Sequence, residues 1–227
     1  MIALDLSNAF GRLSFDLILH VLNLLIHPAS MLYFKSMFRT RTGVIHSNGK
    51  KSLPFTLPRI GCPQGEPTSP VFFNLVINNV YKVIEKEQNA EMCLFADDMS
   101  LIVSGSNWED AYTRATKLVN QIFKHLESIG LSVSSAKSVG IVLGKNNDNP
   151  REPLHTDDGP IMFEEMTTLL GYKFHESLTQ KEHIKHLTQR FNHQRAQLRN
   201  LLDYDNRKQL CKIGASLHFG LYNYLLD

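Results

Sequence analysis

Cysteine is scarce in this sequence, and its scarcity excludes two classes of small protein. The 227 residues contain three cysteines, Cys62, Cys93 and Cys211, which are far apart and odd in number. They form neither a disulfide framework nor a Cys-x-x-Cys zinc pair. This usage is typical of a reducing compartment, so we expect an intracellular protein.

Long apolar runs and a strong net charge are also absent. No apolar stretch reaches the length of a membrane span, and the chain opens on a strand-like Met-Ile-Ala-Leu without a signal peptide. We therefore expect no membrane partner. The hydrophobic content of 43% is sufficient for a globular core in one or two domains.

The formal charge of +2 indicates no partner by itself, but the basic residues are clustered. Six lie within residues 35–59 with no acid among them, and nine lie within residues 173–212. Two basic blocks suit a phosphate backbone better than a membrane. Two solvated faces would give the same pattern.

Two short apolar runs meet at a pair of adjacent acids, Asp97 and Asp98. The runs, residues 92–95 and 99–103, predict two strands joined by a tight turn. Neighbouring carboxylates at such a tip repel each other and lose solvation, so they favour a divalent cation. An isolated Asp-Asp pair is more often an ordinary acidic turn, and the rest of the chain must decide.

The first residues predict a strand that delivers Asp5 to a sheet edge, followed by a turn and Phe10. Ions and ligands often bind at such an edge, and the aromatic side chain of Phe10, five residues after Asp5, could lie beside them. The alternative is that Asp5 caps a turn and Phe10 belongs to the core. Helices are predicted from residue 15 to 25 and from Pro28 onward.

Residues 39–57 predict a basic hairpin. Asn48-Gly49 between two strand-like segments is a strong hairpin signal. The hairpin carries four cations that could hold a sugar-phosphate backbone: Arg39, Arg41, Lys50 and Lys51.

Residues 60–70 combine two glycines with three prolines, which predicts a defined, non-regular loop. Thr68 or Ser69 is expected to cap a helix with Pro70 at its first position. The helix is apolar over most of its circumference and should be buried. Gln64 could hydrogen-bond a nucleotide near the helix N-terminus, although a purely structural turn is the alternative.

The second half predicts an amphipathic helix at 108–129 ended by Gly130, a strand at 139–143, a long polar surface loop at 145–160 and a strand at 169–174. A helix with an apolar face that includes Ile184 follows, and a second helix is expected at 207–225. Lys137 is either a solvated loop lysine or a proton donor. Four histidines lack the cysteine or acid that would complete a zinc site and are expected to face solvent: His175, His183, His186 and His193.

In their order along the chain these segments resemble the palm of reverse transcriptases, and most closely the type encoded by non-LTR (LINE-like) retrotransposons. The resemblance rests on Asp5 with Phe10, residues 61–74, Phe95-Ala96-Asp97-Asp98, residues 130–137 and Leu170-Gly171. It implies an α+β fold with an antiparallel sheet packed on helices, a palm at residues 1–174, the start of a helical thumb at 175–227, and fingers that are largely missing.

The resemblance also implies an RNA-directed DNA polymerase that adds dNTPs to a primer 3′-OH on an RNA template. By it, Asp5, Asp97 and Asp98 hold two Mg²⁺ (or Mn²⁺) ions, with Leu6 in the metal set, and Lys137 donates a proton to pyrophosphate. The nucleotide pocket would contain Phe10, which rejects a ribose 2′-OH, with Gln64, Gly65, Phe95 and Ala96. Besides the hairpin cations, the nucleic-acid set comprises Leu170 and Gly171 at the primer, and Lys185, Arg195 and Arg199.

Two departures leave a second hypothesis open. The family usually has an acid where this chain has Gly11, and only four residues precede Asp5, which indicates a truncated element. The chain is therefore either a polymerase domain or an inactive remnant that binds nucleic acid or a partner protein. For a eukaryotic retrotransposon we expect the nucleus or cytoplasm. The sequence does not indicate an oligomeric state.

Overall fold

The centre of the fold is a six-stranded sheet in the computed structural model, which describes residues 1–39, 41–62, 66–143 and 151–200. Its strands are β1 (Ile2–Asp5), β6 (Ala90–Phe95), β7 (Asp98–Val103), β8 (Val139–Gly140), β9 (Leu154–Thr156) and β10 (Gly159–Phe163). They lie in the order β6-β7-β1-β8-β10-β9. Only β8 and β10 run parallel, so the predicted α+β class with an antiparallel sheet is confirmed.

The opening strand is held in the middle of this sheet by its alternating side chains. Ile2 and Leu4 are buried, while Ala3 and Asp5 are only partly covered, as expected for side chains that alternate between two faces. In the register with β7, Leu4 lies opposite Met99 and Asp5 lies opposite Asp98. The apolar pairs fix this register because a slip by one residue would expose them.

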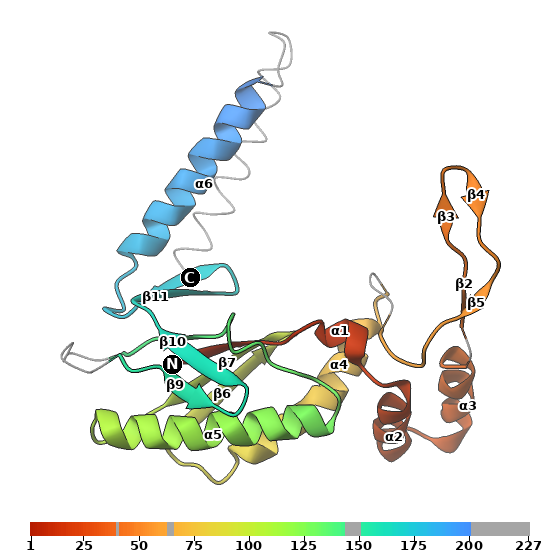
Figure 1. Cartoon of the computed structure of the whole chain (residues 1–227), viewed down its shortest axis with the longest axis horizontal. Coiled ribbons are helices and arrows are strands. Elements are labelled where there is room, and N and C mark those ends of the chain that lie inside the picture. Colours follow the sequence, from red (N-terminus) through yellow and green to blue (C-terminus); the bar gives the residue numbers. More distant parts are fainter. Residues whose placement is uncertain (40, 63–65, 144–150, 201–227) are drawn as a thin grey trace.

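The helix α5 (Trp108–Ser128) packs against the sheet through the predicted apolar face, which includes the fully buried Val119 and Ile122. Asn107 accepts a hydrogen bond from the Asp110 N–H at its start, and Gly130 follows its end at φ +81°. Figure 1 shows α5 along the base of the sheet. The helix forms where the sequence predicts it because its apolar residues recur at regular helical spacing over many turns.

The buried helix after the Gly- and Pro-rich loop is shorter than predicted. The helix α4 (Ser69–Ile77) continues as a 3₁₀ helix, η1 (Asn78–Val83). Phe72, Phe73, Val76 and Ile77 are buried as expected. Thr68 occupies the N-cap position, but its side chain makes no capping hydrogen bond. Pro70 is the second residue of the helix and not, as predicted, the first.

The first half adds three helices and a projecting arm. The helices are α1 (Ala9–Arg12), α2 (Phe15–Leu25) and α3 (Pro28–Met37). The arm contains β2 (Thr42–Gly43), β3 (His46–Ser47), β4 (Lys50–Lys51) and β5 (Phe55–Thr56), so two predicted long strands are four short ones. Asn48 and Gly49 both have positive φ, which confirms the predicted hairpin turn.

Two predictions for the second half are wrong. The polar segment at 145–160 was expected to be a long surface loop or variable insertion, but β9 lies in it and pairs with β10, which begins in it and extends to Phe163. The buried Leu154 and Ile161 anchor this hairpin. The strand expected at 169–174 is a hairpin of β11 (Met166–Leu169) and β12 (Tyr172–His175). Its turn forms because Leu170 and Gly171 both have positive φ, 52° and 81°.

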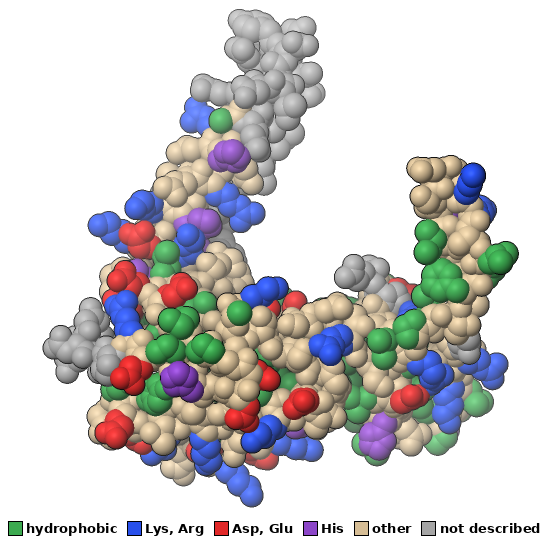
Figure 2. Space-filling model, viewed as in Figure 1, with side chains coloured by type: hydrophobic (Ala, Val, Ile, Leu, Met, Phe, Trp, Pro, Cys, Tyr) green, Lys and Arg blue, Asp and Glu red, His purple; other side chains and the backbone are tan. Residues whose placement is uncertain are grey.

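The helix α6 (Lys181–Asn200) packs against β12 and projects from the body. In Figure 1, α6 and the arm rise on the same side at opposite ends of the molecule, and Figure 2 shows a hollow between them. The helix predicted at 207–225 lies outside the described residues. None of the described helices combines the length and apolar character needed to cross a bilayer.

Candidate active site

The predicted acidic hairpin forms the tip of β6 and β7. Phe95 pairs with Asp98, so Ala96 and Asp97 make a two-residue loop. Ala96 has φ +53°, a backbone conformation that costs a non-glycine residue roughly 1 kcal/mol or more. The loop is maintained by the strands on either side of it, and it leaves Phe95, Asp97 and Asp98 exposed.

Asp5 lies directly across from Asp98. The Asp5 N–H donates to Ser138 Oγ at 3.1 Å, and the Asp5 carbonyl accepts from the Ser134 N–H at 2.8 Å. Because both backbone groups point away from β7, Asp5 and Asp98 form a pair without mutual backbone hydrogen bonds. Side chains approach most closely in such pairs, with Cα atoms about 4.5 Å apart. The sequence prediction that the opening acid meets the distant hairpin is confirmed.

The electrostatics of this corner reflect that proximity. Burial, the Asp97 carboxylate and the Asp5 carboxylate, in that order, raise the pKa of Asp98 above its usual range. The Lys137 Nζ lies 3.9 Å from Asp5 Oδ2, with both side chains largely in solvent. Lys137 is thus a solvated lysine that lies beside Asp5, and its role as a proton donor stays a prediction.

The residues fit a hard divalent cation in chemistry but do not enclose one as they stand. Three carboxylates supply the oxygen ligands that Mg²⁺ prefers, and a cation would offset both the burial and the carboxylate repulsion that raise the pKa of Asp98. Within the described residues, no three His, Cys, Asp or Glu side chains are arranged to hold a metal ion. The Leu6 side chain is buried, so only its carbonyl could contribute.

The structure shows Phe10 packed at the edge of the core, and its predicted place beside a ligand stays a prediction. On α1 it stacks on buried Phe73, with ring centroids 4.7 Å apart, yet it remains half-buried and not fully enclosed. Its carbonyl accepts from the Cys62 N–H at 2.8 Å, which joins α1 to the Gly- and Pro-rich loop. Gln64 and Gly65 lie outside the described residues, so their predicted contacts stay predictions.

Gly61 allows the loop to approach α1 closely, and Gly11 leaves room for the Asn8 side chain. A Cβ at Gly61, which has φ +83°, would lie 2.9 Å from the Gly11 carbonyl oxygen. A Cβ at Gly11 would collide with the side-chain amide of Asn8. The acid usual at this position would therefore require Asn8 to move.

The basic hairpin residues differ in what they contact. The Arg41 Nη2 donates to the Ile60 and Gly61 carbonyls at 3.2 and 3.0 Å, and its guanidinium lies 4.4 Å from the centre of the Phe15 ring. Arg41 thus braces the loop, a role the sequence analysis missed because its partners are 19 and more residues away. Arg39 is exposed, and Lys50 and Lys51 are exposed on the arm.

At the other end of the molecule, Leu170 is 48% exposed at the tip of the β11–β12 hairpin. Lys185 and Arg195 are exposed on α6, where Lys185 pairs with Glu182 at 3.8 Å. Arg199 belongs to α6, but its side chain lies outside what the structure describes. Binding of nucleic acid by these residues stays a prediction.

The prediction that all four histidines face solvent is wrong for His183 and only partly right for His175 and His186, which are partly buried. His183 is 3% exposed: its Nδ1 accepts from the Lys173 N–H at 3.2 Å, and its ring lies 4.0 Å from the Tyr172 ring. On the predicted apolar face of α6, Leu187 and Phe191 are partly buried, whereas Ile184 is 47% exposed. His175 lies on β12 and contacts Ser177, whereas exposed His193 lies on α6.

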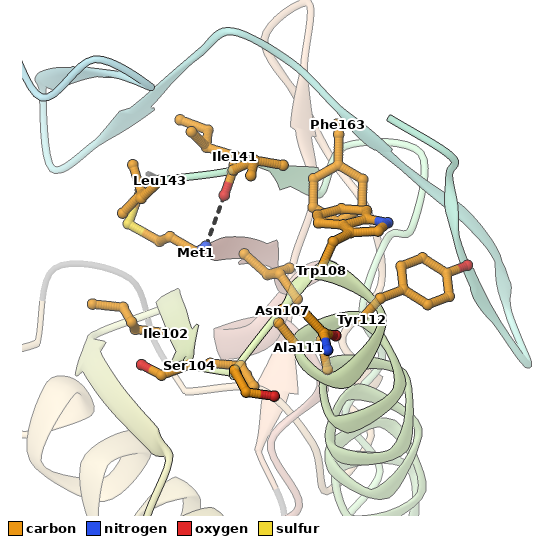
Figure 3. Close-up of a pocket in the computed structure, with 16 residues that line it drawn as sticks. Met1, Ile102, Ser104, Asn107, Trp108, Ala111, Tyr112, Ile141, Leu143 and Phe163 are labelled. Carbon is orange, nitrogen blue, oxygen red and sulfur yellow. Dashed lines mark hydrogen bonds between the residues drawn. The ribbon is translucent and has the colours of Figure 1, made fainter. Parts of the chain in front are cut away.

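A cavity of about 680 Å³ opens at the opposite end of the central strands (Figure 3). Its lining includes Met1, Trp108, Ile141 and Phe163, and the Trp108 and Phe163 rings meet edge to face with centroids 5.3 Å apart. The Met1 ammonium donates to the Ile141 carbonyl, and burial lowers the pKa of that amino group to about 6. None of the predicted site residues lines this cavity.

Comparison with known proteins identifies the family of this chain. Residues 1–191 match the family described as reverse transcriptase (RNA-dependent DNA polymerase). The chain is 31% identical over 84 residues to a retrovirus-related Pol polyprotein from the type-1 retrotransposable element R1 2 of Nasonia vitripennis, and 28% identical over 92 residues to that from element R1. These matches cover 37% and 40% of this chain but only 20% and 27% of the relatives.

Solved structures with the same fold include two yeast telomerases. The apo telomerase of Candida tropicalis, truncated from its C-terminal domain, matches with a TM-score of 0.54 at 14% identity, covering 78% of this chain and 34% of that one. The telomerase of Candida albicans in complex with a fragment of telomeric RNA matches with a TM-score of 0.52 at 14% identity, covering 77% and 30%. The chain belongs to the reverse transcriptase family, RNA-directed DNA polymerases that are nucleotidyltransferases, as a domain of the non-LTR retrotransposon type.

Proposed function

We propose that this chain is the palm of a polymerase that extends a primer 3′-OH with dNTPs on an RNA template, using two divalent cations. The observation that carries the proposal is the close pairing of Asp5 with Asp98 beside Asp97. Bound Mg²⁺ would lower the pKa of the attacking hydroxyl and offset charge on the leaving pyrophosphate. Asp5, Asp97 and Asp98 would hold the ions, with the Leu6 carbonyl next to them.

The neighbouring residues have roles consistent with that chemistry. The exposed Lys137 ammonium, beside Asp5, would donate a proton to the departing pyrophosphate. The ring of Phe10, held by Phe73, would block the space under a ribose C2′. Exposed Phe95 and partly buried Ala96 at the hairpin tip would border the nucleotide, together with Gln64 and Gly65.

The template and primer would lie in the hollow between the arm and α6 seen in Figure 2. Lys50 and Lys51 on the arm, and Lys185 and Arg195 on α6, are exposed cations on its two sides. Contacts from such side chains to phosphates hold a duplex without reading its sequence, and binding then weakens as salt rises. The exposed tip at Leu170 and Gly171 would contact the primer.

A second function, duplex binding without catalysis, is favoured by one observation. Among the described residues no three ligands already form a metal-binding group. A domain of this kind would keep the basic surfaces and bind a duplex in a salt-dependent manner.

Primer extension on an RNA template tests the first function. We expect Mg²⁺-dependent incorporation that falls at least about 10³-fold in the Asp97→Asn variant, because charge stabilisation by a bound cation contributes several kcal/mol. Asp157→Asn is a matched control: Asp157 and Asp158 form another two-residue aspartate loop, between β9 and β10. This control should retain full activity.

Metal binding gives a readout that does not require turnover. Electron paramagnetic resonance of Mn²⁺ should show binding that Asp97→Asn weakens and Asp157→Asn does not. Salt-dependent duplex binding without extension or Mn²⁺ binding would replace the first function by the second.

A further inference from the structure

The backbone of Asp5 lies beyond the end of one strand pairing. The β1–β8 ladder contains only the pairs Ile2 with Gly140 and Ala3 with Val139. On that side Asp5 therefore has no strand neighbour to accept its N–H or to donate to its carbonyl. A backbone group left unpaired there would destabilise the strand end.

Two serines replace the missing strand neighbour. The Ser134 N–H donates to the Asp5 carbonyl at 2.8 Å, and Ser138 Oγ accepts from the Asp5 N–H at 3.1 Å. The Ser138 hydroxyl in turn donates to the Ser134 carbonyl at 2.8 Å, so one side chain joins both ends of the turn to the catalytic strand. Ser138 is 2% exposed, so water has little access to take its place.

The same turn positions Lys137. The Lys137 N–H donates to the Ser134 carbonyl at 3.1 Å, the oxygen that also accepts from the Ser138 hydroxyl. The ammonium of Lys137 then lies 3.9 Å from Asp5 Oδ2. Residues 134–138 are held on the Asp5 backbone, and this attachment fixes the position of the Lys137 ammonium relative to the Asp5 carboxylate.

We propose that Ser138 is a positioning residue for the candidate metal site, acting through its hydroxyl bridge between the Asp5 N–H and the Ser134 carbonyl. The inference rests on the proposed function, in which Asp5 is a metal ligand. Groups that orient a ligand typically change metal affinity by about 10- to 100-fold when removed. Lys137 can be identified as a candidate from the sequence but Ser138 cannot, because a serine in a loop carries no signal of what its hydroxyl contacts.

The test compares Mn²⁺ affinity, by electron paramagnetic resonance, in the whole chain and its serine variants. We expect Ser138→Ala to weaken Mn²⁺ binding about tenfold or more. Ser135→Ala is the control, since Ser135 lies in the same turn, is 7% exposed, and its hydroxyl contacts Thr156 at 3.5 Å and not Asp5. Its affinity should stay within about twofold of the original chain, below the range expected for an orienting group.

An isosteric pair covers the case in which Ser138→Ala does not fold. Ser138→Thr and Ser138→Val add the same bulk, but only Ser138→Thr keeps a hydroxyl. The Ser138→Thr variant should therefore bind Mn²⁺ about tenfold more tightly than the Ser138→Val variant. Amide hydrogen exchange at Asp5, measured in parallel, should speed up wherever the hydroxyl is lost.

The outcomes separate the inference from the proposed function. Faster exchange at Asp5 with unchanged Mn²⁺ affinity would overturn the positioning role and leave the polymerase proposal standing. Absence of Mn²⁺ binding by the unaltered chain would overturn the metal site and the inference with it. Equal Mn²⁺ affinity in the threonine and valine variants would also reject the hydroxyl bridge.

Discussion

At the scale of single residues, Asp98 is the carboxylate of the candidate site whose pKa is raised. Its carboxylate is partly desolvated and faces two others, and these causes together raise its pKa. A group whose pKa is higher in the folded than in the unfolded state is more stable protonated. The contribution of Asp98 to the folding stability of the protein is therefore fully present below its unfolded pKa of 3.8 and is lost as the pH rises through its folded pKa.

Replacing Asp98 by Asn should therefore raise the melting temperature at pH 7 and leave it unchanged near pH 3, where both side chains are neutral. The gain should be less than about 1 kcal/mol, because exposed carboxylates are well screened. Calorimetry at the two pH values measures it, with Asp157→Asn as the control. An equal change at both pH values would show that packing and not charge is responsible.

At the scale of elements, two hairpins with aspartate-bearing tips can be compared within one chain. The β6–β7 hairpin lies next to β1, so Asp98 faces Asp5. In the β9–β10 hairpin, Asp157 pairs with Lys124 at 3.3 Å, and β10 pairs with β8 instead of β1. The same residue type at the same kind of turn thus meets an acid in one case and a cation in the other.

The β11–β12 turn has a leucine in a left-handed conformation, which costs roughly 1–2 kcal/mol. Leu170→Asn should stabilise the protein by about 1 kcal/mol, because asparagine tolerates positive φ. If the tip contacts the primer, the same change should weaken binding of a primer–template duplex. Calorimetry and fluorescence anisotropy measure the two effects.

Leu178→Asn is the matched control, since Leu178 has φ +55° and is 65% exposed. It should stabilise the protein without weakening duplex binding. Equal binding by the two variants would argue against a primer contact at Leu170.

The attachment of α6 should depend on pH through His183. Burial, and secondarily His186, lower the pKa of His183 from 6.5. A histidine whose folded pKa is depressed gives stability above its unfolded pKa and loses it as pH falls through the folded pKa. Amide exchange in α6 should therefore speed up below about pH 6.5, after correction for intrinsic rates.

His183→Gln should remove this pH dependence, because glutamine retains an acceptor for the Lys173 N–H but does not titrate. His193→Gln, at an exposed position on the same helix, should keep it. A pH response that survives His183→Gln would point to another group.

At the scale of the whole molecule, the arm and α6 stand on either side of a hollow (Figure 2). The overall charge is only +2, so an attraction for phosphates must come from the distribution of cations. Lys50 and Lys51 are two of these cations, at the far end of the arm.

Replacing Lys50 and Lys51 by alanine should reduce the slope of log affinity against log salt by about 2, since each phosphate contact contributes about 0.9. Titration of a duplex at several salt concentrations measures the slope. The charge-matched control is Lys117→Ala with Lys124→Ala on α5, which runs along the opposite side of the body (Figure 1). An equal loss of slope in both double variants would exclude the arm as a specific contact.

The sequence by itself determined the elements with regular local patterns. The period of α5, the two strands around Asp97 and Asp98, and the turn at Asn48-Gly49 are all set by residues close in the chain. The order of the motifs likewise identified the family. Weakly patterned segments, such as β9 and β10, were missed because their strands are short and their burial depends on distant partners.

Only the tertiary structure decided which side chains meet. The motif order predicted that Asp5 meets the distant hairpin, but only the strand register set Asp98 as its direct partner. Packing of the whole chain turned Arg41 and His183 inward and brought the Ser138 hydroxyl to the Asp5 backbone. Local pattern specifies the period and face of an element, but contacts between elements depend on packing of the whole core. The chemistry of the site follows from those contacts.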